Sequence, residues 1–275
     1  MWNLFRKTPP KIGLSLGSGG AKGMAHIGAL KAFAEEGIEF DIVTGTSIGS
    51  IVGAAYAMGM DWEQIYQTVK TVNFSALRKK GLLASITMTD SESIERALIP
   101  IFGEERDISS LQKPFAAVSV DLLTGEEAIF TQGNLVKSLT ASSAIVPVFS
   151  PLVWEGKHLV DGAYLNPIPA DVARALGAEV VISIDLSTPK SAATDSLQMV
   201  GVMLSTIKIA MKNARYKGHQ NSDIVVHPDL TGYAATKFEG LDEMFLIGYE
   251  ETKKRLPEIK NLLKRHRVKF GGKHG

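Results

Sequence analysis

Ser47 stands between two glycines, Gly45 and Gly49, in the stretch VTGTSIGSIVG. An apolar run typical of a buried strand precedes this Gly-x-Ser-x-Gly pattern, and a helix-like run of small residues follows it. Flanking glycines relieve the crowding at a tight strand-to-helix turn, which is one way to hold a nucleophilic serine. The following helix would supply free N–H groups and the positive end of its dipole to an oxyanion. The pattern favours a nucleophile, and a small-residue turn capped by Ser47 is the alternative.

A second glycine-rich turn, GSGGAKG at Gly17–Gly23, also follows an apolar run and precedes a helical pattern. Gly19 and Gly20 would let the backbone approach a ligand, and consecutive N–H groups can bind an anion. A Walker-type loop needs Ser or Thr after its lysine, but glycine follows Lys22, and the spacing of a dinucleotide loop is also missing. The turn could form an oxyanion hole for Ser47 if both turns lie at one sheet edge. A non-catalytic lipid- or nucleotide-binding loop and a tight turn without a ligand are the alternatives.

A nucleophilic serine needs a general base, and two kinds of residue could supply one. The six histidines are His26, His158, His219, His227, His266 and His274. His219 and His227 follow the serine in the order of an α/β-hydrolase triad, but that fold places its nucleophile after more strands than the two that precede Ser47. The other candidate is Asp161, which follows a predicted strand and precedes Gly162. An Asp-Gly pair is also typical of a plain turn, which is the alternative for this residue.

Alternating strand and helix patterns must position these residues. Strands are predicted at 12–16, 40–46, 115–122, 125–130, 158–160, 180–184 and 223–228. Helices are predicted at 21–37, 48–59 and 170–177 and within 61–110. One more helix is expected to end at about Lys217 and another to begin at about Met244, while 141–153 is expected to be a proline-bearing connection. The alternation predicts a three-layer α/β/α fold with a mainly parallel central sheet. Sites in such sheets lie at the carboxyl ends of the strands.

The composition is that of a globular α/β domain. The chain has 275 residues, 45% of them hydrophobic and 21% charged, which suits one large domain. It has no cysteine, so disulfides and thiolate chemistry are excluded. No apolar run reaches the length of a membrane span, and the N-terminus lacks the apolar core of a signal peptide. We therefore expect a cytoplasmic protein, peripheral to a membrane at most.

Basic residues gather at the C-terminus. From Lys253 onward there are nine Lys or Arg and one acidic residue, Glu258, a pattern found in tails that meet anionic membranes and also in solvated helix faces. Three stretches pair apolar residues with cations as interfacial anchors do, namely 1–7, 78–83 and 256–270. The apolar side of the last stretch consists of Leu256, Ile259, Leu263 and Phe270. This side is expected to face a membrane or to dock on the domain or on a second subunit of a homo-oligomer.

Four short blocks, in order, make the chain resemble the patatin-like phospholipases, most closely short bacterial members related to neuropathy target esterase. SGGAKG at 18–23 is similar to the family's oxyanion loop, although Ser18 stands where the family often has glycine. GTSIGS at 45–50 is similar to its nucleophile turn. ASSAIVPVF at 141–149 is similar to the block before its last motif, and DGA at 161–163 to that Asp-Gly-Gly/Ala motif.

The resemblance implies a serine lipid acyl hydrolase, a carboxylic ester hydrolase of the esterase, lysophospholipase or phospholipase A type. Ser47 would be the nucleophile and Asp161 its base, without a histidine, in a mechanism that passes through an acyl-enzyme. Burial should raise the pKa of that carboxyl. The implied oxyanion donors are the backbone N–H groups of Gly19, Gly20 and Ala21, and the further motif residues are Gly45, Gly49, Lys22, Gly23 and Gly162.

The same resemblance implies a lipid or ester substrate, with no metal, no cofactor and no nucleic-acid partner. Acyl transfer to an acceptor other than water is the alternative within the same chemistry. The patatin-like domain is expected at 11–256, between an N-terminal tail at 1–10 and a basic C-terminal helix and tail at 257–275.

Overall fold

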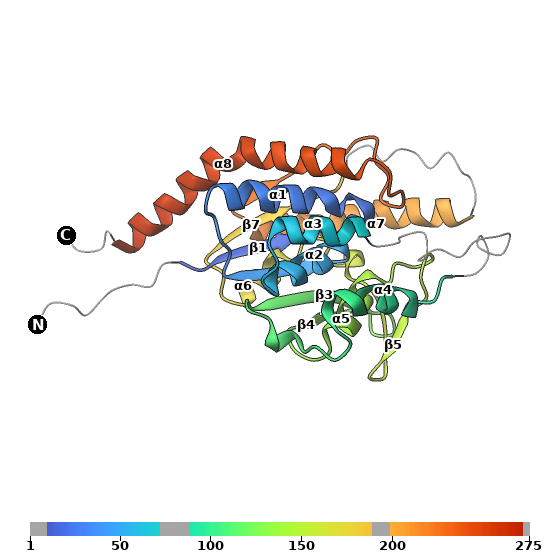
Figure 1. Cartoon of the computed structure of the whole chain (residues 1–275). Coiled ribbons are helices and arrows are strands. Elements are labelled where there is room, and N and C mark those ends of the chain that lie inside the picture. Colours follow the sequence, from blue (N-terminus) through green and yellow to red (C-terminus); the bar gives the residue numbers. More distant parts are fainter. Residues whose placement is uncertain (1–9, 72–87, 189–198, 272–275) are drawn as a thin grey trace, which may run out of the picture.

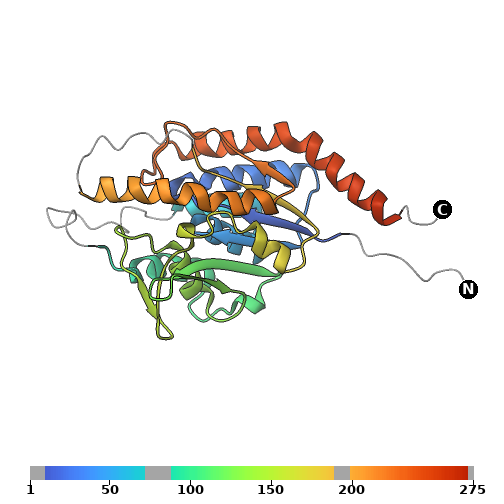
Figure 2. The ribbon, with the colours of Figure 1, turned by 180° about the vertical axis from the view of Figure 1, so that it is seen from behind.

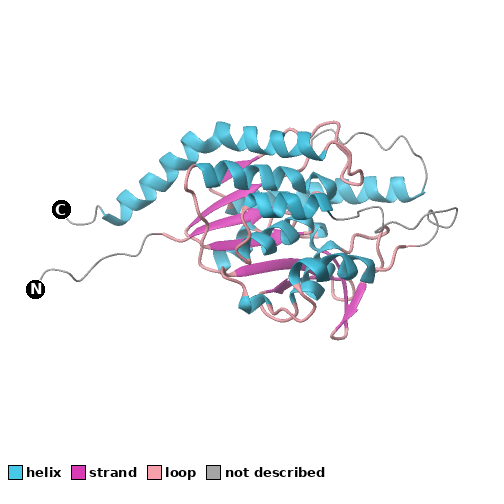
Figure 3. Ribbon diagram, in the orientation of Figure 1, coloured by secondary structure: helices cyan, strands magenta, loops and turns pink. Residues whose placement is uncertain are grey.

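The computed structural model describes residues 10–71, 88–188 and 199–271 (Figure 1). Two of the stretches considered as membrane contacts, 1–7 and 78–83, lie outside the described residues. Within the described parts of the chain, eight strands form one sheet, and helices cover both of its faces (Figure 3). The predicted three-layer α/β/α class is confirmed.

The sheet has a parallel centre and an antiparallel end. Its strands are β1 (Ile12–Leu16), β2 (Ile42–Thr46), β3 (Phe115–Asp121), β4 (Glu126–Phe130), β5 (Leu152–Trp154), β6 (Lys157–Asp161), β7 (Val180–Ile184) and β8 (Ile224–Val226). They follow the order β5-β6-β3-β2-β1-β7-β8, and β4 also pairs with β3. The strands from β3 through β2, β1 and β7 to β8 run parallel. β4 and β6 are antiparallel to β3, and β5 is antiparallel to β6.

The central strands are buried almost throughout because both faces of the sheet are covered, and apart from Asp121 at the end of β3 their polar residues are Ser and Thr. Successive side chains of a strand point to opposite faces. On β2, Val43 packs in the main core while Ile42 packs in a smaller cluster with residues of helix 170–175. On β7, Ile182 and Val181 divide between the same two cores. The correct sequence signal for these strands is therefore a run of apolar and small residues without alternation between apolar and charged positions.

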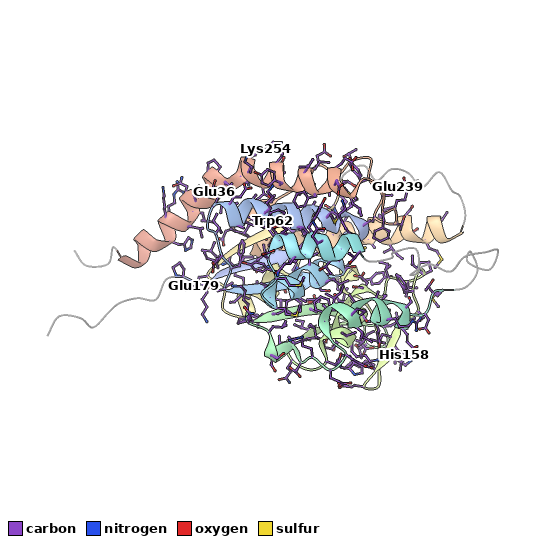
Figure 4. All side chains as sticks on the ribbon, in the orientation of Figure 1. Glu36, Trp62, His158, Glu179, Glu239 and Lys254 are labelled. Carbon is purple, nitrogen blue, oxygen red and sulfur yellow. The ribbon has the colours of Figure 1, made fainter. Side chains whose placement is uncertain are left out.

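The helices form the outer layers. They are α1 (Met24–Glu35), α2 (Ile48–Ala57), α3 (Trp62–Thr71), α4 (Glu92–Phe102), α5 (Leu135–Ser143), α6 (Ala170–Ala175), α7 (Met199–Asn221) and α8 (Leu241–Gly271), with short 3₁₀ turns η1 (Gly20–Gly23), η4 (Ile108–Ser110) and η5 (Gly162–Tyr164). α8 lies along α1, with α3 beside them, and α6 and α7 are seen on the other side (Figure 2). Trp62 of α3, labelled in Figure 4, joins this layer, since its ring lies 5.9 Å from that of Phe245 and 5.0 Å from Lys31 Nζ.

The C-terminal helix docks on the domain. α8 runs through Pro257, so the boundary expected between 256 and 257 falls inside a helix. Leu256 and Ile259 belong to the main core, and Leu263 packs against it. The first part of the apolar side considered as a membrane contact is therefore covered by the domain itself.

Two elements were not predicted, α5 and β5. Only a connection was expected at 141–153, whereas α5 begins at Leu135 and extends into that range. The Asn134 side chain caps this helix by accepting a hydrogen bond from the Lys137 N–H at 2.9 Å. β5 is a three-residue strand paired with β6.

Candidate active site

The turn between β2 and α2 holds Ser47 in a conformation that non-glycine residues rarely adopt, with φ 56° and ψ −130°. A Cβ at Gly45 would lie 2.3 Å from the carbonyl oxygen of Gly49, and a Cβ at Gly49 would lie 2.1 Å from that of Leu16. Both outer positions of the pattern therefore require glycine, because only backbone stands in the way. The Ser50 hydroxyl donates to the Ser47 carbonyl at 2.6 Å and helps to fix the turn.

The two glycine-rich turns are in direct contact. β1 and β2 are parallel neighbours with Leu16 opposite Gly45, so both turns leave the sheet at the same edge. A Cβ at Gly23 would lie 2.2 Å from Cγ1 of Ile48, the first residue of α2. Both turns therefore lie at the same sheet edge, which is the arrangement that an oxyanion hole at Ser47 would require.

Strand β6 brings Asp161 to Ser47. β2 pairs with β3 as far as Val118, and β6 pairs with β3 from Ser119 in the opposite direction. The pairing of β4 with β3 overlaps both sets, so β4 lies on the other side of β3. The carboxyl ends of β2 and β6 therefore meet end to end beside β3. At this junction the Ser47 hydroxyl donates a hydrogen bond to Asp161 Oδ2 at 2.6 Å.

Asp161 is enclosed by protein, with 1% of its surface exposed. Its other oxygen, Oδ1, accepts a hydrogen bond from the Ala163 N–H at 2.8 Å. Gly162 packs against β3, because a Cβ there would lie 2.2 Å from the Val118 carbonyl oxygen. Burial raises the pKa of Asp161 to about 7, while the hydrogen bonds from Ser47 and Ala163 act in the opposite direction. A carboxyl with this pKa can accept a proton near neutral pH.

The three implied oxyanion donors are not equivalent. The Ala21 N–H donates to the Ala235 carbonyl at 2.8 Å. Gly20 has φ +57°, and a Cβ there would lie 2.3 Å from the same carbonyl oxygen. No hydrogen-bond acceptor within the described ranges pairs with the N–H groups of Gly19 and Gly20. Among the described residues, the structure thus gives a partner only to the third donor, in the loop that precedes α8.

Two residues support the site in ways that were not predicted from the sequence. Ser142 Oγ accepts the Ser47 N–H at 2.9 Å and donates to the Val118 carbonyl at 2.6 Å, tying the nucleophile turn to β3. His26 is fully buried on α1, and its Nε2 donates to the Gly17 carbonyl at 2.7 Å. Burial lowers the pKa of His26 to about 4, so its imidazole is neutral. Ser142 lies inside the ASSAIVPVF block, and this was the only sequence signal for a supporting role of either residue.

Lys22, His219 and His227 have bonding partners other than Ser47. Lys22 is 6% exposed, and its Nζ donates to Thr188 Oγ1 at 3.1 Å. His219 Nε2 and His227 Nδ1 lie 2.9 Å and 3.4 Å from Asp185 Oδ2, beyond the end of β7. His158, labelled in Figure 4, lies on β6, His266 lies on α8, and His274 is outside the described residues.

A family model described as patatin-like phospholipase matches residues 14–174. The chain belongs to the patatin-like phospholipase family. The resemblance inferred from the four sequence blocks is thus confirmed, and the matched range contains both glycine-rich turns and Asp161.

Two curated relatives that this chain matches are much longer than it is. Patatin-like phospholipase domain-containing protein 7 of Rattus norvegicus is 37% identical over 183 residues, which are 64% of this chain and 14% of that protein. Lysophospholipase nte1 of Aspergillus fumigatus is 26% identical over 283 residues, covering 91% of this chain and 18% of the relative. The solved structure of VipD from Legionella pneumophila shares the fold, with a TM-score of 0.61 at 14% identity, over 91% of this chain and 67% of VipD.

In the described ranges, no group of three or more His, Cys, Asp or Glu side chains is placed to hold a metal ion. Nor does any helix there combine the length and apolarity needed to cross a bilayer.

Proposed function

We propose that this chain is a serine lipid acyl hydrolase that cleaves carboxylic esters with Ser47 as nucleophile and Asp161 as general base. The observation that carries the proposal is the 2.6 Å hydrogen bond from Ser47 Oγ to Asp161 Oδ2, beside two glycine-rich turns in contact. Each histidine side chain for which the structure gives a hydrogen bond pairs with Gly17 or Asp185 instead. The carboxylate is therefore the base that the geometry offers.

The first half-reaction acylates the serine. Ser47 Oγ attacks the ester carbonyl carbon while its proton passes to Asp161, and the carbonyl π electrons move onto oxygen. The N–H groups of Gly19 and Gly20 would bind this oxyanion, and a donor of this kind contributes about 3 kcal/mol in a studied protease. When the tetrahedral intermediate collapses, the alcohol leaves with the proton from Asp161, and the acyl group stays on Ser47.

The second half-reaction releases the acid. Asp161 takes a proton from a water molecule as the water oxygen attacks the acyl carbonyl. The same N–H groups would bind the second oxyanion. When this second tetrahedral intermediate collapses, the acid leaves and Asp161 returns the proton to Ser47 Oγ. One carboxyl group thus carries the proton in each step, which suits a pKa near neutrality.

Lipid esters are the proposed substrates. The family match and the relative named as a lysophospholipase support this class. Because the chain spans less than a fifth of those curated relatives, we carry over only the class of bond, an ester between a fatty acid and a glycerol-type alcohol.

A fluorophosphonate probe and an ester panel test this function. We expect the probe to label wild type covalently at Ser47, and Ser47→Ala to lower hydrolysis of p-nitrophenyl esters and lysophospholipids by roughly 10⁴-fold or more. Ser138→Ala is the matched control, because this buried hydroxyl bonds the Asn134 carbonyl of its own helix. An unlabelled, inactive wild type would indicate a binding module, and transfer of the acyl group to added lysolipid would indicate an acyltransferase.

A further inference from the structure

Helix α7 presents a line of apolar side chains to solvent. Val202 is 47% exposed, Ile209 74% and Tyr216 68%, and these residues follow one another at intervals of seven. Residues seven apart in an α-helix lie within about 20° of each other around its axis. The three side chains therefore form one stripe, called the α7 stripe below, with the exposed Met203 next to its start.

The C-terminal part of α7 is fixed to the domain. A Cβ at Gly218 would lie 2.4 Å from the carbonyl oxygen of Ile168, so the backbones are in close contact there. His219 Nε2 lies 2.9 Å from the buried Asp185 Oδ2. These contacts set the rotation of the helix, and they direct the α7 stripe away from the protein.

α7 is basic as well as apolar. Its 23 residues contain no Asp or Glu, and its Lys and Arg residues are Lys208, Lys212, Arg215 and Lys217. Lys217 is paired with Glu127 and Asp171 of the domain at 2.6 Å and 2.8 Å. Lys212 is exposed, and it lies about one turn from both Ile209 and Tyr216, where a helical side chain flanks its neighbours. The solvent side of the helix is thus apolar along its centre and cationic at its border.

The position of α7 connects it to the site. The helix contacts η5, the turn that follows Asp161 directly. Its N-terminal end projects beyond the body of the domain, on the side away from the C-terminal end of α8 (Figure 2). A flat surface placed against this end would therefore approach the sheet edge at which Ser47 and Asp161 lie.

We propose that α7 docks the protein onto an anionic lipid surface, with the α7 stripe among the lipid headgroups and Lys212 against their negative charge. Helices with a narrow apolar side and Lys or Arg beside it bind at this interface. Coiled-coil pairing of α7 with the α7 of a second copy would need a further apolar residue between each pair of stripe residues. The chain has Ser205 and Thr206 in the first interval, and Lys212 and Asn213 in the second. The inference rests on the proposed function, since a lipid surface is where that substrate resides.

Vesicle co-sedimentation of the full chain tests this docking surface. All proteins carry Ser47→Ala, so that binding is measured without turnover, and vesicles contain phosphatidylcholine with or without phosphatidylglycerol. Val202→Gln with Ile209→Gln should weaken binding to anionic vesicles about tenfold, as expected for two partly inserted side chains. Leu122→Gln with Leu123→Gln is the matched control, because these side chains are 55% and 69% exposed after β3, and it should bind like the parent. Lys212→Gln should weaken binding at low salt and lose its effect as salt screens the charge.

Equal binding by the stripe variant and its control would overturn the proposal. A parent dimer that becomes monomeric in the stripe variant, seen by light scattering, would also overturn it and assign the stripe to a second copy. With Ser47 restored, the stripe variant should hydrolyse a short soluble ester at the wild-type rate, and a loss there would count against a docking role. If no wild-type ester hydrolysis is found while vesicle binding depends on the stripe, the docking surface stands and the proposed function fails.

Discussion

Ser47 presents its hydroxyl from a strained backbone. A non-glycine residue at φ 56° and ψ −130° lies in a sparsely populated region, at a cost of about 1–3 kcal/mol. The surrounding contacts impose this conformation, because the Ser47 N–H bonds Ser142 Oγ and its carbonyl accepts the Ser50 hydroxyl. The strain directs Oγ toward Asp161, and its energy can be measured.

Ser47→Gly is expected to be more stable than Ser47→Ala by about 1 kcal/mol, since glycine adopts a positive φ without steric cost while alanine keeps the Cβ. Urea unfolding of the two variants provides the measurement. Both lack the hydroxyl, so its loss cancels between them. An alanine variant as stable as the glycine variant would mean that the turn is unstrained.

Asp161→Asn is expected to stabilise the fold at alkaline pH. The pKa of Asp161 is raised from 3.8 in the unfolded chain to about 7 in the folded one. Below about pH 4 the carboxyl is neutral in both states, and as pH rises toward 7 the unfolded state alone ionises and gains stability. Asparagine stays neutral, so the variant should exceed wild type by on the order of 3 kcal/mol at about pH 8. Thermal unfolding at about pH 4 and pH 8 measures this, and an advantage that does not grow with pH would contradict a buried, ionising carboxyl.

At the residue scale, the sequence predicts reactive groups better than their supports. Ser47 and Asp161 stand out because each follows an apolar run and has glycine within two positions. The engagement of the Ala21 N–H by Ala235 could not be predicted, since that contact joins segments more than two hundred residues apart. In the sequence, nothing distinguishes Ser142 from other small residues of a helix. Its hydrogen bond with the Ser47 N–H becomes visible only in the folded structure.

At the element scale, the end of β7 supports the oxyanion loop. Asp185 Oδ1 accepts the Ser187 N–H at 2.8 Å, which fixes the segment after the strand. Leu186 of this segment packs on the loop, because a Cβ at Gly19 would lie 2.9 Å from Leu186 Cβ. Burial alone would raise the pKa of Asp185, but hydrogen bonds from two histidines and from Ser187 hold it well below its usual range.

Asp185→Asn should therefore lower kcat for a soluble ester about tenfold with little change in KM, because it misplaces an oxyanion donor without touching substrate. It should also destabilise the fold by about 2 kcal/mol at neutral pH. The depressed pKa makes this contribution present above about pH 4 and lost as pH falls further. Asp223→Asn is the control, since Asp223 bonds Arg174 and the Val181 N–H away from the loop. If both variants lose stability and neither loses kcat, Asp185 has only a structural role.

Long apolar elements were predicted well, and short or polar ones were not. β1, β2, β3 and β7 consist mainly of apolar and small residues that are buried on both faces of the sheet, and glycine or polar residues follow them. β5 has three residues and exists only by pairing with β6. Its Val153 is 64% exposed, so no burial pattern marks it. α5 was missed because the proline of the following connection obscured the helix that begins at Leu135.

At the scale of the whole molecule, alternation of strands and helices was enough for the fold class, because parallel strands need helical crossovers. Which helix covers which surface depended on tertiary contacts. α8 illustrates this, since its apolar side suited a membrane or the domain equally from sequence, and Ile259 is completely buried. The α7 stripe could not be predicted either, because the sequence does not show which apolar residues of a helix remain exposed to solvent.

The central claim is that a carboxylate, not a histidine, activates Ser47. It is tested most directly by kcat/KM for a short soluble ester between about pH 5 and pH 9, in wild type, Asp161→Asn, His219→Ala and His227→Ala. The dyad predicts a wild-type rate that rises with pH through an inflection near 7, the pKa of Asp161, because the ionised form is the base. Both histidine variants should keep this inflection and stay within about tenfold of wild type, whereas Asp161→Asn should lose at least about 10³-fold at every pH. A histidine variant that loses activity as completely as Ser47→Ala, or an Asp161→Asn enzyme that retains the wild-type profile, would contradict the account.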